Sequence, residues 1–212
     1  MDTQADLSPL GIIEALLFVS DAPVSLERIE AVLDGYSKAE VNRLLADLLE
    51  QYRQPDRGIS LSEVAGGYRL TTKPEAAPWI QRLRGSKPAR LSRAALETLA
   101  LIAYKQPITK PEIVAVRGVM VDGVLKTLVE RDLVRILGRK PEVGRPILYG
   151  TSRSFLEYFG FKDLSELPTL KEIEALAPNP APERTNQGAA GKEASHEAVE
   201  HIEEAEGIVR PD

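Results

Sequence analysis

The sequence predicts a mainly α-helical protein with small β wings (an α+β fold), built from two copies of one domain and a disordered acidic tail. A proline, a helix-capping residue and apolar positions recur at an offset of 84 residues. The matched pairs are Pro23 and Pro107, Ser25 and Thr109, and Ile29 and Ile113. The same offset aligns the apolar face of the third helices, Val41, Leu44, Leu45 and Leu49 with Leu125, Leu128, Val129 and Leu133. Each copy ends in two β-rich runs, and apolar periodicity stops at Pro178. Three helices followed by a hairpin form a winged helix, so we expect two in tandem.

The first winged-helix domain is expected over residues 8–84. Apolar residues at helical spacing predict helices at 8–20, 25–34, 37–53 and 75–83. The stretch "ISLSEVAGGYRLTT" (59–72) predicts a hairpin in which Gly66 and Gly67 form a two-residue turn. A basic linker is expected over 85–91.

The second winged-helix domain is expected over 92–177 and opens with Ser92 as a helix N-cap. In "QPITKPEI" (106–113), Thr109 and Glu112 have the spacing of a capping box, and Pro111 falls in the first helical turn. The helices are predicted at 92–105, 110–117 and 121–132, the hairpin at 133–151, and appended helical segments at 152–160 and 167–177.

Charge is distributed unevenly along the chain, whose net charge is −5. Residues 1–84 carry 9 basic and 13 acidic groups, residues 85–168 carry 14 and 9, and residues 169–212 carry 4 and 10. The run of basic residues around the linker has three possible interpretations: a solvated connector, a binding site for an acidic protein, or a loose contact with phosphate groups. Its members are Arg82, Arg84, Lys87, Arg90 and Arg93. Residues 178–212 are expected to form a disordered acidic tail, although "HEAVEHIEEAEGIV" has a weak amphipathic pattern without an evident partner.

The residue types argue against an enzyme, and we predict no catalytic, cofactor or metal site. The chain has no cysteine, and its two histidines, His196 and His201, both lie in the tail. The stretch "GAAGKE" (188–193) lacks the spacing of a phosphate-binding loop. No signal peptide or membrane span is expected, and the absence of cysteine suits a reducing cytoplasm.

The third helix of each domain carries too little positive charge to read DNA. A winged helix of this class inserts that helix in the major groove, and specific binding neutralises about 6–10 phosphates. Helix 37–53 is neutral, and helix 121–132 is slightly acidic. A DNA-binding regulator therefore stays only as the alternative to a protein-binding role.

Aromatic and basic residues mark two candidate contact regions. The predicted partner-binding residues in the second domain are Arg139, Arg145, Tyr149, Phe155 and Tyr158. Phe155 is expected mainly in the core. The two tyrosines are better candidates for a contact surface, because their phenol groups can lie at a solvent-exposed edge of the core. In the first domain, Tyr68 and Trp79 are either core residues or part of a homodimer interface.

Two long stretches resemble the bacterial segregation and condensation protein B family. They are "LSRAALETLALIAYKQPITKPEIVAVRG" and "LVERDLVRILGRKPEVGRPILYGTSRSFLEYFG", and the opening "IIEALLFVSDAPVSLERI" is similar to the start of the same family. The resemblance covers roughly residues 8–177, and the tail lies outside it.

This resemblance implies a non-enzymatic subunit of a condensin-like complex. Such a subunit forms a homodimer mainly through its first domain and binds a kleisin subunit of the segregation and condensation protein A type. The kleisin links it to a structural-maintenance-of-chromosomes ATPase, which supplies the ATP chemistry for chromosome condensation and segregation. The implied location is the cytoplasm, at the nucleoid, with at most weak non-specific DNA contact and no cofactor.

Overall fold

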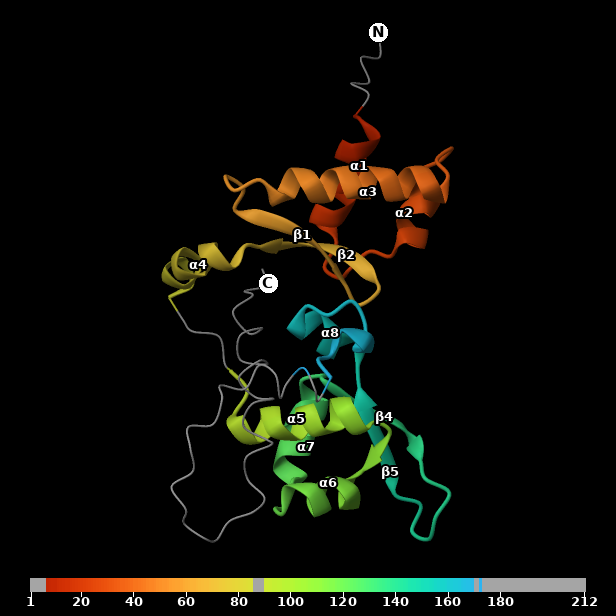
Figure 1. Cartoon of the computed structure of the whole chain (residues 1–212), viewed down its shortest axis with the longest axis vertical. Helices are drawn as coiled ribbons and strands as arrows, with labels where there is room; N and C mark the ends of the chain where they lie inside the picture. The colour runs from red at the N-terminus through yellow and green to blue at the C-terminus, as the bar shows by residue number, and fades with distance from the viewer. Residues whose placement is uncertain (1–6, 86–89, 170–171, 173–212) are drawn as a thin grey trace. The chain divides into compact units, whose positions relative to one another are not determined.

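The computed structural model describes residues 7–85, 90–169 and 172 (Figure 1). The described residues form two compact units. Among the described residues, the first contains 7–85 and Gly160–Asp163, and the second contains 90–159, 164–169 and 172. Each unit has three helices followed by a hairpin, so the expected mainly α fold with small β wings is confirmed.

The first unit packs three helices against a two-stranded hairpin. The helices are α1 (Pro9–Val19), α2 (Leu26–Val32) and α3 (Lys38–Arg53), the strands are β1 (Ile59–Val64) and β2 (Gly67–Thr72), and η1 (Pro74–Ala76) and α4 (Ala77–Arg84) follow. One face of α3 supplies four of the buried side chains: Val41, Leu45, Leu48 and Tyr52. They meet Ile13 and Ile29 in one apolar core.

The second unit repeats this plan with one additional short strand. Its elements are α5 (Arg93–Lys105), β3 (Ile108–Thr109), α6 (Lys110–Arg117), α7 (Asp122–Glu130), β4 (Val134–Arg139), β5 (Ile147–Thr151), α8 (Arg153–Phe159) and η2 (Leu164–Glu166). The strands form an antiparallel sheet in the order β3-β5-β4. Of the predicted helix at 167–177, only residues 167–169 and 172 are described, and the predicted tail at 178–212 lies outside the described residues.

Helix starts follow the predicted capping residues. Ser25 and Ser92 each accept a hydrogen bond from a backbone N–H in the first helical turn. Thr109 and Glu112 form the expected capping box, in which each accepts from the backbone N–H of the other. A side-chain N-cap of this kind contributes about 1 kcal/mol.

The turn of the first hairpin lies one residue earlier than predicted. Ala65 and Gly66 are the turn residues, with φ of 50° and 70°, and Gly67 is already paired with Val64 in the strand. Positive φ at both central residues is the requirement of a type I′ turn. Gly67 has a different role, because a Cβ there would lie 2.9 Å from the backbone C and O of Val24.

The third helices do not align at the 84-residue offset of the second helices. That offset pairs Leu45 with Val129, but Leu45 is buried and Val129 is exposed. The buried residues instead match at an offset of 80: Val41 with Val121, Leu45 with Leu125, and Leu48 with Leu128. Val121 is the N-cap of α7, whereas Val41 lies one turn inside α3, so α3 has an extra first turn.

Candidate partner-binding surfaces

The charged groups on α7 are few and are tied to neighbours. Lys126 is the only cation of this helix and lies 3.7 Å from Glu130, and Asp122 pairs with Lys110 on α6. On α3, Lys38 and Arg53 pair with acidic groups, at 3.6 Å from Glu27 and 3.2 Å from Glu50. Neither third helix therefore presents the cationic face that a DNA-reading helix needs.

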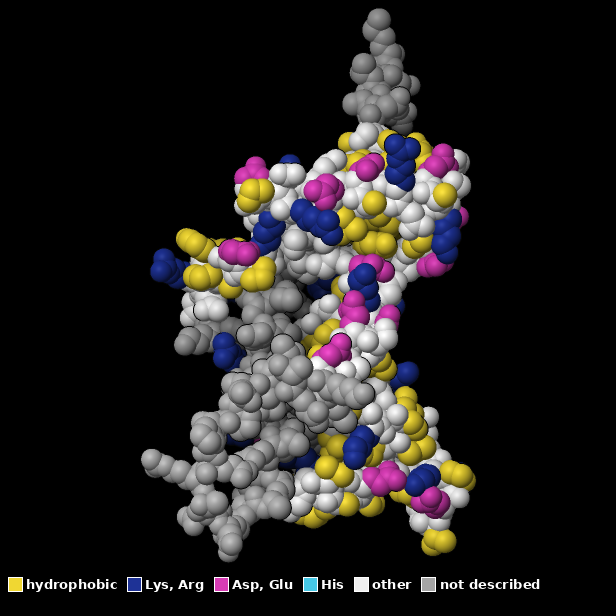
Figure 2. Space-filling view, in the orientation of Figure 1, with side chains coloured by type: hydrophobic (Ala, Val, Ile, Leu, Met, Phe, Trp, Pro, Cys, Tyr) yellow, Lys and Arg dark blue, Asp and Glu magenta, His cyan; other side chains and the backbone are white. Residues whose placement is uncertain are grey.

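The wing of the second unit, which comprises β4, β5 and the loop between them, exposes apolar side chains. Ile136 is 58% exposed, its neighbour Leu137 is also exposed, and Val143 in the loop is fully exposed. Hydrophobic side chains gather along this wing in the space-filling view (Figure 2). The register of the sheet shifts between Ile136 and Gly138, so Leu137 is an extra residue in β4.

Three of the five predicted partner-binding residues lie on the wing, and two of them are in contact. Arg139 on β4 donates a hydrogen bond to the backbone carbonyl of Arg145 at 3.1 Å. Tyr149 on β5 lies opposite Ile136 in the sheet register. Both arginines are exposed and Tyr149 is partly buried, so the wing carries cationic as well as apolar side chains.

The two predicted contact residues on α8 differ in their exposure. Phe155 is 1% exposed, and its ring packs against Phe159 with centroids 5.0 Å apart. Its place is therefore in the core of the second unit rather than on the surface. Tyr158 is partly buried and meets the same Phe159 ring edge-on at 4.9 Å.

The wing loop is anchored to the start of α6. The Nζ of Lys140 lies 3.0 Å from Oε1 of Glu112 and 3.0 Å from a carboxylate oxygen of Glu142. The backbone N–H of Thr109, its hydroxyl and the Lys140 ammonium hold the pKa of Glu112 at about 2, below the ordinary value of 4.5. The capping box and the wing therefore share one carboxylate.

We expect the second unit to lose stability in acid through Glu112. Because the pKa of this group is lower in the folded state, its stabilising contribution is complete above pH 4.5 and is lost as pH falls towards 2. Urea denaturation followed by circular dichroism from pH 2 to 7 should show a stability difference between wild type and Glu112→Gln that shrinks over this window. A Glu130→Gln control should not reproduce that shape, and a difference independent of pH would contradict the prediction.

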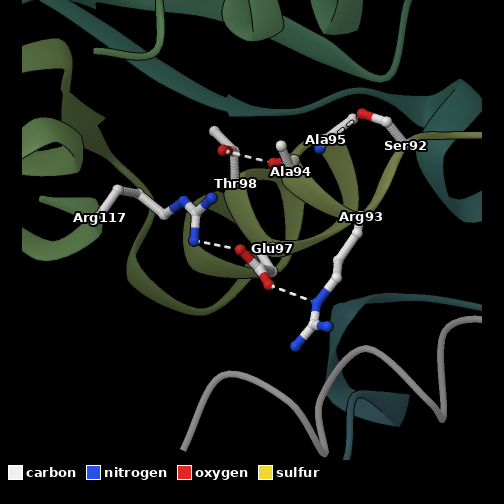
Figure 3. Close-up of polar contacts among 7 residues, drawn as sticks. All are labelled: Ser92, Arg93, Ala94, Ala95, Glu97, Thr98 and Arg117. Carbon is white, nitrogen blue, oxygen red and sulfur yellow. Dashed lines mark hydrogen bonds and ion pairs between the residues drawn. The ribbon is translucent and has the colours of Figure 1, made fainter. Parts of the chain in front are cut away.

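A second polar cluster joins α5 to α6 (Figure 3). Glu97 accepts from Nε of Arg93 at 3.1 Å and also pairs with Arg117. The side chains of Glu97 and Arg117 are only 14% and 15% exposed, and Nε of Arg117 is buried without an acceptor among the described residues. This pair is structural, because it fixes the C-terminal end of α6 against α5.

The two predicted dimer residues of the first unit lie in different settings. Tyr68 on β2 is partly buried against the core, and burial raises the pKa of its phenol. Trp79 on α4 is exposed. Two exposed apolar residues at the end of α1, Phe18 and Val19, were not among the predicted contact residues.

The described residues offer no sign of a metal site or a membrane span. No group of three or more His, Asp or Glu side chains able to hold a metal ion occurs within 7–85, 90–169 and 172. No helix in these ranges has the length and apolar character needed to cross a bilayer. His196 and His201 lie outside the described residues.

Comparisons with known proteins identify the family. The family model described as "Segregation and condensation complex subunit ScpB" matches residues 11–170. Segregation and condensation protein B of Syntrophotalea carbinolica is 54% identical over 166 residues, which is 78% of this chain and 84% of that protein. The protein of the same name from Symbiobacterium thermophilum is 52% identical over 183 residues, covering 86% and 83%.

Two solved structures are also similar. The crystal structure of ScpB from Mycobacterium tuberculosis shares 35% identity, covers 72% of this chain and 95% of that chain, and has a TM-score of 0.34. A dimer of the ScpB N-terminal domain complexed with ScpA peptide shares 40% identity over 35% of this chain and 91% of that chain, also with a TM-score of 0.34. The family match and the curated relatives carry the assignment: this chain belongs to the segregation and condensation complex subunit ScpB family.

Proposed function

We propose that this protein is a non-enzymatic subunit of a condensin-like complex, in which it binds a kleisin subunit of the segregation and condensation protein A type. The kleisin would connect it to a structural-maintenance-of-chromosomes ATPase, which hydrolyses the ATP. The observation that carries the proposal is the combination of an apolar wing with third helices that lack a cationic face. Family membership supports the same role in chromosome condensation and segregation.

We place the kleisin contact on the wing of the second unit. Ile136, Leu137 and Val143 supply apolar area, and Arg139 and Arg145 supply a cationic rim. Protein interfaces commonly have such an apolar centre and polar rim, with arginine and tyrosine enriched. Tyr149 and Tyr158 remain in the proposed contact set, whereas Phe155 leaves it because its ring is buried.

Homodimerisation is assigned to the first unit, where the predicted dimer residue Trp79 on α4 and the exposed side chains of Phe18 and Val19 on α1 supply apolar area. Large contiguous apolar patches on a protein surface commonly mark sites of association. Tyr68 contributes less to this proposal, since its ring already packs on the core. A monomeric mass in sedimentation equilibrium at micromolar concentration would contradict homodimerisation.

The complex is placed in the cytoplasm at the nucleoid, with at most weak, non-specific DNA contact.

We expect Ile136→Glu to weaken kleisin binding by about 30-fold, because a central apolar contact contributes about 2 kcal/mol and a buried carboxylate adds a desolvation cost. Val116→Glu is the matched control: Val116 is 56% exposed, against 58% for Ile136, and lies in the last turn of α6 rather than on a wing strand. Isothermal titration with the purified kleisin measures both variants.

If both variants weaken kleisin binding equally, the kleisin does not bind at the wing. The alternative function is that of a winged-helix DNA-binding regulator. It predicts that the protein does not bind kleisin, and that it binds one DNA sequence with an affinity that falls steeply as salt concentration rises. Co-purification with the kleisin after nuclease treatment separates the two functions.

A further inference from the structure

The sheet of the second unit has one open edge, which is the outer edge of β4. In the strand order β3-β5-β4, the central strand β5 is paired on both sides. β3 has only two residues and leads directly into α6, whereas β4 has six residues and no strand of the described residues pairs with its outer edge. An open edge presents backbone N–H and C=O groups that a strand of another chain can bind.

The backbone N–H of Arg139 faces this open edge. In an antiparallel pair, residues whose backbone groups bond to the neighbouring strand alternate with residues whose backbone groups point away from it. Just after β4, the N–H of Lys140 donates to the carbonyl of Pro146 at 2.9 Å, so Lys140 is directed towards β5. Arg139 precedes Lys140 by one residue and is therefore directed outward.

The backbone N–H of Ile136 faces the same edge. Just before β4, the carbonyl of Leu133 accepts from the N–H of Ser152 at 3.2 Å, so Leu133 is directed towards the chain that continues β5. Alternation along the next three residues directs Ile136 outward. The extra residue of the strand, Leu137, follows Ile136 at the register shift.

The register shift restricts the open edge to a short stretch. A bulge interrupts regular pairing and is one means by which proteins limit association through sheet edges. Val134, at the start of β4, is 1% exposed, whereas Ile136 is 58% exposed and Arg139 is also exposed. The accessible edge therefore spans residues 136–139, which suits a short extended segment rather than a long strand.

The side chains around this edge favour an acidic segment. Residues 134–151 contain one acidic group, Glu142, and four basic groups, Arg135, Arg139, Lys140 and Arg145. Lys140 is paired with Glu142 and Glu112, but the three arginines form no ion pair among the described residues. Arg139 instead donates to the backbone carbonyl of Arg145. A partner that brings carboxylates would compensate this positive charge.

We propose that an extended, acidic segment of the kleisin adds to the outer edge of β4 as a further strand. Backbone carbonyls of the segment accept from the N–H groups of Ile136 and Arg139, and its apolar side chains pack beside Ile136 and Leu137. In strand addition of this kind, main-chain hydrogen bonds supply affinity and alternate side chains supply specificity. The inference rests on the kleisin-binding role proposed above and specifies how the wing holds that partner.

Hydrogen exchange measured by NMR on the full-length protein, with and without purified kleisin, tests the proposal. At a kleisin concentration of about 100 times Kd, we expect the amides of Ile136 and Arg139 to exchange about 100-fold more slowly, because exchange then proceeds through the free protein. The amide of Val143, in the wing loop outside the strand, should slow much less.

A pair of variants at Arg139 separates its N–H from its side chain. Arg139→Ala removes the guanidinium and keeps the N–H, whereas Arg139→Pro removes both. Proline is tolerated on an edge strand where the N–H faces outward. We expect Arg139→Pro to bind kleisin about 10-fold more weakly than Arg139→Ala in isothermal titration, because one further hydrogen bond is lost. If the proline disturbs the wing, the exchange rates of the wild type decide.

The outcomes distinguish this inference from the proposed function. If kleisin binds while the amides of Ile136 and Arg139 exchange at their free rates, strand addition is wrong and kleisin binding stands. Slowing confined to Val143 would have the same meaning, because the kleisin would then contact only the wing loop. Slowing that increases with protein concentration without kleisin would assign the edge to a second copy of the chain and overturn the inference. Absence of kleisin binding would overturn both proposals.

Discussion

Replacing Gly67 with alanine should destabilise the first unit by about 3 kcal/mol, at the upper end of the range for overpacking a closed site. The added Cβ would lie 2.9 Å from the backbone C and O of Val24 and 3.0 Å from the backbone C of Pro23. Backbone atoms cannot rotate away as a side chain can. Val24 is also held in place, because its N–H and C=O both exchange hydrogen bonds of 2.9 Å with Tyr68.

Native-state hydrogen exchange at the amides of Val24 and Tyr68 measures this effect within the first unit. We expect faster exchange at both positions in Gly67→Ala, because the bridge between them must separate to admit the methyl group. Gly58→Ala is the control: Gly58 precedes the same hairpin, has nothing within 4 Å of a built Cβ and does not require positive φ. Similar exchange in the two variants would show that the bridge tolerates the shift.

The hairpin illustrates what the sequence can and cannot predict. Two adjacent glycines, Gly66 and Gly67, correctly indicated a tight turn at this place. Glycine serves two separate needs, positive φ and close backbone approach, and the sequence does not distinguish them. The structure assigns the first need to Gly66 and the second to Gly67, because Val24 arrives from a distant part of the chain. Ala65 then occupies the other turn position.

Local signals predicted the helices well, and nonlocal packing limited the rest. The capping residues Ser92 and Thr109 act within one turn, so their spacing was sufficient to identify them. The sequence correctly predicted that α7 has an apolar face. It aligned this face with that of α3 at an offset of 84 residues, whereas the buried residues match at an offset of 80. The difference lies in where each helix begins relative to the core, and periodicity alone does not report the start.

The candidate surface was only partly predictable for a related reason. The sequence singled out the basic and aromatic residues of the second unit, and it correctly expected Phe155 mainly in the core, whereas Tyr158 is only partly buried. It missed Ile136 and Leu137, since alternation along a strand predicts that neighbouring residues face opposite sides and one of them is buried. The irregular register at Leu137, on a strand at the edge of the sheet, leaves both exposed.

Removing the carboxylate of Glu97 should destabilise the second unit by about 3 kcal/mol, because deleting one partner leaves a largely buried charge without compensation. In Glu97→Ala, the guanidinium of Arg117, whose side chain is only 15% exposed in the wild type, loses this carboxylate. Its Nε already has no acceptor among the described residues. A new cavity beside α5 adds to the cost.

Urea denaturation of the full chain, followed by hydrogen exchange of α5 and α6 amides, tests this expectation. Lys126→Ala is the control, because it breaks an ion pair whose side chains are 76% and 62% exposed and which should contribute less than about 1 kcal/mol. The double variant Glu97→Leu/Arg117→Met should recover most of the loss, since an apolar pair of similar volume removes both desolvated charges. If Glu97→Ala costs no more than Lys126→Ala, the Arg117 guanidinium is solvated and the cluster does not hold α6 against α5.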